Sequence, residues 1–152
     1  MVRWFQSASG RPKASGMIDV YTAPGVVETT YDPSTRTMSV IWRKLSGHEH
    51  LRPCMQAQVE QVRRGCKHLI VDVSEATGVL ADEHQRWFET DIFPEYSRCG
   101  LEHLITVLPK SALTQLGAKR WNQTASSFGF RTFLAASRDD ARKLIEEAKS
   151  AA

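Results

Sequence analysis

The stretch KHLIVDVSEATGVLADEHQRWFETDIFP, residues 67–94, decides the fold of this chain. It predicts a buried strand over residues 68–73, then a turn-rich loop, then an aromatic helix opened by Asp82. A strand followed by a helix is the repeating unit of α/β proteins, whose binding or switching sites often lie at this junction. The loop and the helix start carry no obvious catalytic set, so the sequence favours a non-enzymatic α/β module.

Strands and helices alternate outward from this stretch in both directions. The first two strands are joined by a short turn at Asp32 to Thr35, whereas the later strands need crossover helices between them. The sequence therefore predicts an α/β fold with a mixed, mostly parallel, five-stranded sheet and about four helices. The predicted order is β-β-α-β-α-β-α-β-α, with strands over residues 26–31, 37–42, 68–73, 104–108 and 130–135.

Serine, aspartate and proline mark the predicted helix ends. Capping-box patterns start at Ser46 and Asp82, and Ser137 caps the last helix. Pro53 either kinks the first helix or marks its true first turn. Pro94 is expected to bend the second helix, because a proline ring clashes with the carbonyl four residues before it.

Length, composition and the chain start favour one ordinary domain. Apolar residues make up 41% and charged residues 24% of the 152 positions, which is typical of globular proteins. Residues 1–25 place glycine and proline among small polar residues, so we expect a flexible N-terminal tail before a domain over residues 26–150. Whether residues 18–21 of this tail pair with or pack onto the domain is open at this stage. The absence of a membrane-length apolar run and of a secretory signal leads us to expect a cytoplasmic protein.

Charge and cysteine content argue against several functional classes. Of 20 basic and 17 acidic residues, the first 25 positions hold three and one, so the remainder carries 17 and 16 and offers no basic face for nucleic acid. Three cysteines without a CxxC pattern argue against disulfides and a zinc knuckle. His48 and His50 flank Glu49, but at a helix start they point about 200° apart, so we expect neither a metal nor a cofactor.

Four features together resemble a known family. Trp42 closes a strand, Asp72 ends the next one, a W-x-x-x-[DE]-x-F-P pattern spans residues 87–94, and a capped terminal helix follows Ser137. Over residues 26–150 the chain resembles the STAS-like fold, also called SpoIIAA-like, and more closely the uncharacterised bacterial STAS/Sec14-like proteins. The resemblance implies a scaffold that binds a protein or a ligand.

One part of the family's switch is missing from this sequence. Anti-sigma-factor antagonists of this fold are switched by phosphorylation of a serine in the turn that opens the helix after this strand. The matching positions are Ala81 and Asp82, which cannot accept a phosphate. The resemblance therefore implies a module without the phospho-switch, in which Asp82 places a permanent negative charge at a helix N-terminus.

The candidate ligand or partner site lies at the carboxyl ends of the parallel strands and on the aromatic helix. Whether its aromatic residues line an apolar pocket or pack the core is open at this stage. No G-x-S-x-G elbow, Walker loop or dinucleotide motif is present, so no catalytic residue is assigned. The candidate residues are Trp42, Asp72, Ser74, Asp82, Trp87, Asp91, Phe93 and Lys110.

Three functions are consistent with these residues. The first is a non-catalytic regulatory or protein-interaction module with a protein partner. The second is a carrier or sensor of a small apolar, lipid-like ligand, because the Sec14-like relatives hold lipids. The third is a cryptic hydrolase that uses Asp72 or Asp82 beside His84. A homodimer is open in each case.

Overall fold

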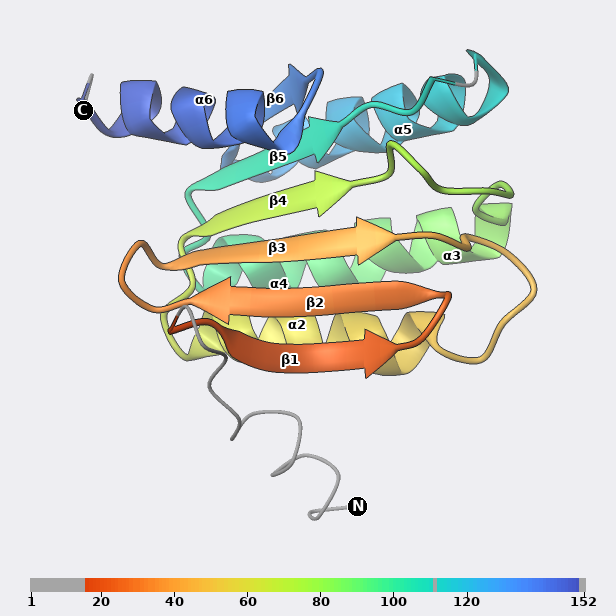
Figure 1. The fold of residues 1–152 in the computed structure, drawn as a ribbon, viewed down its shortest axis with the longest axis horizontal. Coiled ribbons are helices and arrows are strands. Elements are labelled where there is room, and N and C mark those ends of the chain that lie inside the picture. The colour runs from red at the N-terminus through yellow and green to blue at the C-terminus, as the bar shows by residue number, and fades with distance from the viewer. Residues whose placement is uncertain (1–15, 111, 151–152) are drawn as a thin grey trace.

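Six strands form one mixed sheet in the order β1-β2-β3-β4-β5-β6 in the computed structural model, which describes residues 16–110 and 112–150. β1 pairs with β2 and β2 with β3 in antiparallel fashion, and the pairings from β3 to β6 are parallel (Figure 1). The strands span Ile18–Ala23 (β1), Val27–Asp32 (β2), Thr37–Trp42 (β3), His68–Asp72 (β4), His103–Val107 (β5) and Arg131–Ala135 (β6).

The predicted fold class is confirmed as α/β with four helices, but the sheet has one strand more than predicted. Residues 18–23 form β1 and pair with β2, so the predicted mostly parallel five-stranded sheet is a mixed six-stranded one. This strand lies inside the segment predicted as a tail, so the domain begins before residue 26. Its isoleucine, valine, tyrosine and threonine favour a strand, but the glycines and prolines around it favour a tail, and pairing with β2 decides between the two. Residues 1–15 lie outside the described residues.

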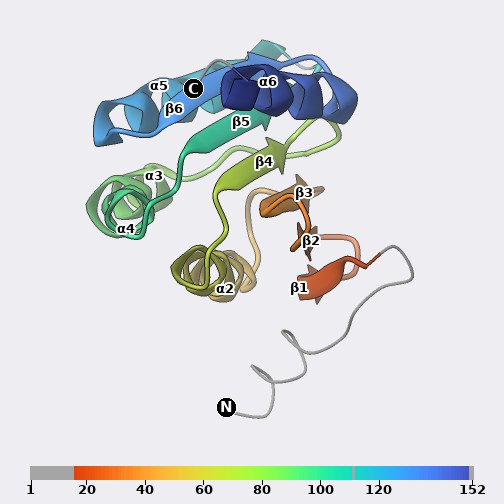
Figure 2. The ribbon, with the colours of Figure 1, turned by 90° about the vertical axis from the view of Figure 1, so that its left-hand side faces the viewer.

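Four helical segments cover the sheet. Figure 2 shows α2 to α5 on one face and α6 on the opposite face. α3, the π-helical turn η1 and α4 follow one another without a break, and the short 3-10 turn η2 extends α5. Their bounds are Leu51–Arg63 (α2), Asp82–Trp87 (α3), Phe88–Ile92 (η1), Phe93–Arg98 (α4), Ala112–Ala125 (α5), Ser126–Phe128 (η2) and Arg138–Ser150 (α6).

The burial pattern of each strand follows from this coverage. Every residue of β4 and β5 is buried, because helices pack on both faces of these strands. β2 instead alternates between buried and half-buried residues, the pattern of a strand with one covered face. Among the described helices, none lies over the other face of β1 and β2 (Figure 1).

One predicted helix start is wrong, and the position of Pro53 shows why. α2 begins at Leu51 with His50 as its N-cap, and not at Ser46, so Pro53 stands in the first turn, where a proline's missing N–H costs nothing. The π-helical turn η1 ends just before α4, which carries Pro94 in its first turn. The helix interrupted near Pro94 thus contains a π turn, a common irregularity of helices, where we expected a bend.

A buried polar network connects the sheet with α2 and α4. Tyr96 donates a hydrogen bond from its hydroxyl to Gln58 Oε1 at 3.0 Å, and Gln58 Nε2 donates to Cys54 Sγ at 3.4 Å. Thr29 Oγ1 of β2 lies 3.5 Å from the same sulfur. Burial raises the pKa of the Cys54 thiol to about 11, so this cysteine is a neutral part of the core, as expected for an inert thiol.

Candidate functional site

Polar side chains gather in an open cleft of about 560 Å³ at the carboxyl edge of β4, β5 and β6. Because parallel strands end at the same edge, the turn after β4, the loop after β5 and the start of α6 meet there. The cleft brings together three of the predicted site residues, Asp72, Ser74 and Lys110. Its charged and hydroxyl-bearing lining includes Asp72, Ser74, Glu75, Lys110, Arg138 and Arg142.

Asp72 connects the turn after β4 to the start of α6. Its side chain is 6% exposed, and its Oδ2 forms an ion pair with Arg138 Nε at 3.0 Å. Its Oδ1 accepts from the Ser74 backbone N–H at 2.9 Å and from Ser74 Oγ at 2.6 Å. Both carboxylate oxygens are thus engaged within the protein, which is the arrangement of a structural group and not of a general base.

The Asp72–Ser74 arrangement occurs a second time in the chain. In the turn between β2 and β3, Asp32 Oδ1 accepts from the Ser34 backbone N–H at 3.0 Å and from Ser34 Oγ at 2.6 Å. This Asp-x-Ser turn lies on the surface, where the aspartate side chain stabilises the turn by accepting hydrogen bonds from the residue two positions on. The geometry of Ser74 is therefore that of a turn residue, and it gives no support to a serine nucleophile.

The charges of the cleft balance one another. Arg138 pairs with the buried carboxylate of Asp72, and Arg142 pairs with Asp139 at 3.1 Å. Lys110 has no ion-pair partner among the described side chains. It lines the same cleft as Glu75, whose charge is opposite. The cleft is consequently polar without being strongly attractive to either sign of ligand charge.

The aromatic candidates divide between the core and the surface. Trp42 is 2% exposed and its ring lies 5.8 Å from that of His48, so it packs the core edge. Phe93 is 3% exposed within the main core. Trp87 is half-buried, and the guanidinium carbon of Arg52 lies 4.4 Å from its ring centroid, a cation–π contact. Trp42 and Phe93 therefore belong to the core and do not form an aromatic pocket.

Asp82 does not cap its helix, contrary to the capping-box interpretation. The N-cap of α3 is Ala81, which keeps an extended backbone with ψ 149°, and Asp82 is the first helical residue without a cap hydrogen bond. The Asp82 side chain is exposed and lies 3.7 Å from Arg120 of α5. Asp91 is also exposed and accepts a hydrogen bond from Thr90 Oγ1 at 2.8 Å. Neither carboxylate reaches the cleft that holds Asp72.

Two large apolar side chains are exposed near the start of α3. Val79 is 49% exposed and lines a small apolar pocket of about 20 Å³ between the loop after β4, α3 and α5. Leu116 of α5 is 68% exposed and precedes Gly117, which lines the same pocket. We call the group of Val79, Asp82, Leu116 and Arg120 the loop–helix surface. Sequence analysis did not identify Val79 or Leu116, because an apolar residue in a loop or an amphipathic helix is indistinguishable from a core residue until the chain folds.

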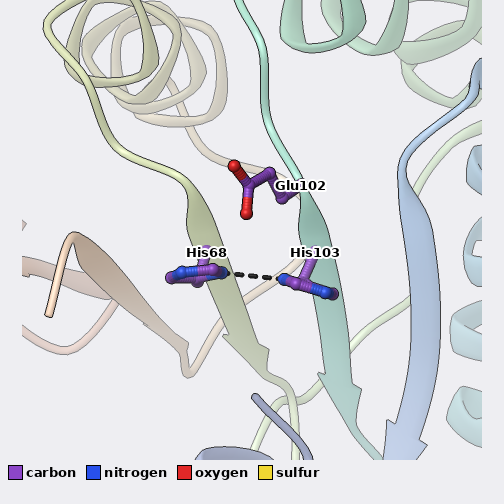
Figure 3. A group of neighbouring side chains, drawn as sticks. All are labelled: His68, Glu102 and His103. Carbon is purple, nitrogen blue, oxygen red and sulfur yellow. Dashed lines mark hydrogen bonds between the residues drawn. The ribbon is translucent and has the colours of Figure 1, made fainter. Parts of the chain in front are cut away.

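A second cluster lies at the opposite, amino edge of the sheet. His68 and His103 are the first residues of β4 and β5 and stand opposite each other in the ladder. Figure 3 shows their rings side by side, with Nδ1 to Nδ1 at 2.9 Å, and Glu102 beside them. One ring must donate and the other accept, so the two neutral rings carry different tautomers. Each of the three residues offers a ligand atom, and these atoms lie within 4.8 Å of one another.

Burial keeps both of these histidines neutral at neutral pH. The pKa of His68 is lowered to about 4, mainly because burial removes water from the ring and secondly because of charge repulsion with His103. The pKa of His103 is lowered below its usual value, mainly by burial and secondly by the positive charge of Arg131. Sequence analysis missed the pair, although a signal existed: each histidine starts a buried strand, and neighbouring parallel strands bring their first residues together.

The two histidines considered from the sequence make other contacts. His50 Nδ1 lies 2.9 Å from the hydroxyl of Tyr21, and His48 Nδ1 accepts the His50 backbone N–H at 3.1 Å. These bonds connect the loop before α2 to β1. His48 and His50 thus position a loop and do not converge on a common ligand.

No family model, curated protein or solved structure matches this chain. The STAS-like resemblance accordingly stays a prediction, and the fold is stated as α/β. Within residues 16–110 and 112–150, no helix combines the length and the apolar character needed to cross a membrane.

Proposed function

We propose that this chain is a non-catalytic, STAS-like regulatory module that binds a protein partner through the loop–helix surface. The observation that carries the proposal is the exposure of Val79 shortly before α3 and of Leu116 on α5. Leu116 lies one helical turn before Arg120, which pairs with Asp82 in the first turn of α3. The family resemblance places the switch of anti-sigma-factor antagonists at this same helix start. Exposed apolar side chains with a charged pair at their border are typical of a protein-binding patch.

The hydrolase alternative has less support. It would need Asp72 or Asp82 to work together with His84, and no hydrogen bond or ion pair joins His84 to either carboxylate among the described residues. Asp72 is engaged by Ser74 and Arg138, and Asp82 faces Arg120. A general base needs a reacting group within hydrogen-bond reach, and this arrangement offers none.

The ligand-carrier alternative rests on the apolar pocket next to Val79. Its lining includes Leu80, Gly117 and Trp121, whose indole Nε1 is buried without a hydrogen-bond partner. A volume of about 20 Å³ is close to the space of a single water molecule. A lipid-like ligand would therefore have to displace the loop after β4, and protein binding at the same surface requires no such movement.

Substitution of the exposed apolar residues is expected to weaken partner binding strongly. The wild-type protein is immobilised and exposed to lysate from cells that naturally make it, and captured proteins are quantified by mass spectrometry after crosslinking. Val79→Asp and Leu116→Asp should each reduce recovery of the specific partner at least about tenfold, because apolar anchors in interfaces contribute roughly 2 kcal/mol or more.

Leu134 provides the matched control for this experiment. It is also a large exposed apolar residue, at 41%, but it lies on the edge strand β6 away from the loop–helix surface. Leu134→Asp should leave recovery unchanged. Equal recovery by wild type, Val79→Asp and Leu116→Asp, or equal loss in Leu134→Asp, would contradict the proposed docking surface.

Asp82→Ser tests the permanent charge at the helix start. We expect the free energy of unfolding to change by less than about 1 kcal/mol, because an exposed ion pair contributes little and no cap is lost. Association with the captured partner should become slower and less dependent on salt, since border charges act on the association rate. Asp139→Ser is the control, because Asp139 is likewise an exposed, paired acid in the first turn of a helix. Unchanged kinetics in Asp82→Ser would refute a role for this charge.

A further inference from the structure

The amino edge of the sheet holds a group of side chains that the proposed function does not use. We propose that His68, His103 and Glu102 bind a divalent transition-metal ion of the zinc class. Two imidazoles and one carboxylate are a donor set that zinc uses in proteins, and imidazole nitrogen also suits copper and nickel. The site lies at the opposite end of the strands from the loop–helix surface, so it is independent of partner binding there.

The spacing of the donor atoms fits one ion. Two nitrogens bound to the same ion at about 2.0–2.1 Å, with an angle between 90° and 110°, are roughly 2.9–3.4 Å apart. The two Nδ1 atoms are 2.9 Å apart, and a ligand atom of Glu102 lies within 4.8 Å. The positions are held by the β4–β5 ladder, in which His68 and His103 are directly paired. Backbone rearrangement is therefore unnecessary, which lowers the cost of forming the site.

Metal binding would replace the hydrogen bond between the two rings. In Figure 3 the Nδ1 atoms face each other, and the Glu102 carboxylate lies to one side of the line that joins them. The donating ring would move its proton from Nδ1 to Nε2, and both rings would turn their Nδ1 lone pairs toward the carboxylate. No proton is released in this exchange, because both rings start and end as neutral imidazoles.

The surrounding charges are compatible with a cation. Lys149 and Arg131 disfavour positive charge at the two rings, whereas Glu102 and Glu146 favour it. Lys149 also lies 3.6 Å from Glu146, and the Arg131 guanidinium lies over the ring of Phe133. Before the ion binds, the charges of two carboxylates offset those of two cations around the rings. Glu102 would also coordinate the metal ion directly.

An open cleft gives access to the site. It has a volume of about 500 Å³ and is lined by Glu102 and His103 together with Arg131 and Lys149. Three protein ligands leave at least one coordination position of a tetrahedral ion for water or an external ligand. A closed structural site would supply a fourth protein ligand, so this geometry corresponds to an accessible site.

Calorimetric titration of untagged protein with Zn²⁺ alone tests the proposal, with Mg²⁺ as the hard-ion control. Wild type should bind about one Zn²⁺ per chain and no Mg²⁺, and the side-chain NMR signals of His68 and His103 should shift on addition of Zn²⁺. Glu102→Gln and His103→Gln should each weaken Zn²⁺ binding at least about tenfold, since loss of even an indirect partner commonly costs 10–100-fold.

Two further variants separate this site from other zinc-binding groups. His84→Gln removes a histidine at the opposite edge of the sheet, and Cys99→Ser removes the partly exposed thiol, so both should bind Zn²⁺ like wild type. Glu102 is exposed, so Glu102→Gln stays informative if His103→Gln fails to fold. Absence of Zn²⁺ binding by wild type, or binding that survives Glu102→Gln and leaves the His68 and His103 signals unshifted, would overturn the proposal.

Discussion

Trp42→Ala is expected to lower the free energy of unfolding by about 3–5 kcal/mol, the usual cost of removing a fully buried tryptophan. The side chain is 2% exposed and closes the core at the end of β3. Its removal leaves a cavity that the surrounding strands and α2 cannot fill completely. Urea unfolding followed by circular dichroism measures the difference directly.

Trp87→Ala is the matched control for this substitution. Trp87 is only half-buried, and Arg52 covers one of its faces. Its removal should cost about 1–2 kcal/mol, because partly exposed apolar area contributes in proportion to the area removed from water. If Trp42→Ala costs no more than Trp87→Ala, then Trp42 does not pack the core as described.

Asp72→Ala should lower the free energy of unfolding by about 2–3 kcal/mol, because hydrogen bonds to a buried charged group contribute about 1.5–3 kcal/mol. The substitution removes the acceptor of Ser74 and the partner of Arg138 at once. The Arg138 guanidinium is 47% exposed and can return to water, so its loss of a partner adds little. Chemical denaturation again provides the measurement.

Asp32→Ala separates the turn from the buried ion pair. Asp32 makes the same two hydrogen bonds to Ser34 but lies at the surface without an arginine partner among the described residues. We expect this substitution to cost less than about 1 kcal/mol. Equal costs for Asp72→Ala and Asp32→Ala would show that neither the burial of Asp72 nor its contact with Arg138 adds to stability.

The sequence predicts those parts of the fold that depend on neighbouring residues. The apolar run that begins at His68 is a strand, and Ser137 caps α6 by accepting the Asp140 backbone N–H at 3.1 Å. Gly100, with φ +89°, ends the helix that contains α4. Each of these features follows from backbone preferences within one or two turns of chain, so a local pattern is sufficient to identify it.

Other local patterns were overruled by the folded chain. The serine pattern at Ser46 resembles a helix start, yet the loop before α2 continues to His50, whose ring bonds to Tyr21 of β1. β1 is rich in strand-favouring residues but lies between Gly16 and Pro24, and its pairing with β2 decides that it forms a strand. In both places a contact with a distant residue decides the conformation, because local capping or strand propensity contributes too little free energy to decide it alone.

The sequence by itself determined the α/β class, the alternation of strands and helices, and the absence of the phospho-accepting serine at Ala81 and Asp82. Only the tertiary structure decided which side chains meet. It buried Trp42 in the core, exposed Leu116, and aligned His68 with His103 across 35 residues of chain. The physical reason is that periodicity specifies which face of an element is apolar, whereas strand order and register specify which residues become neighbours.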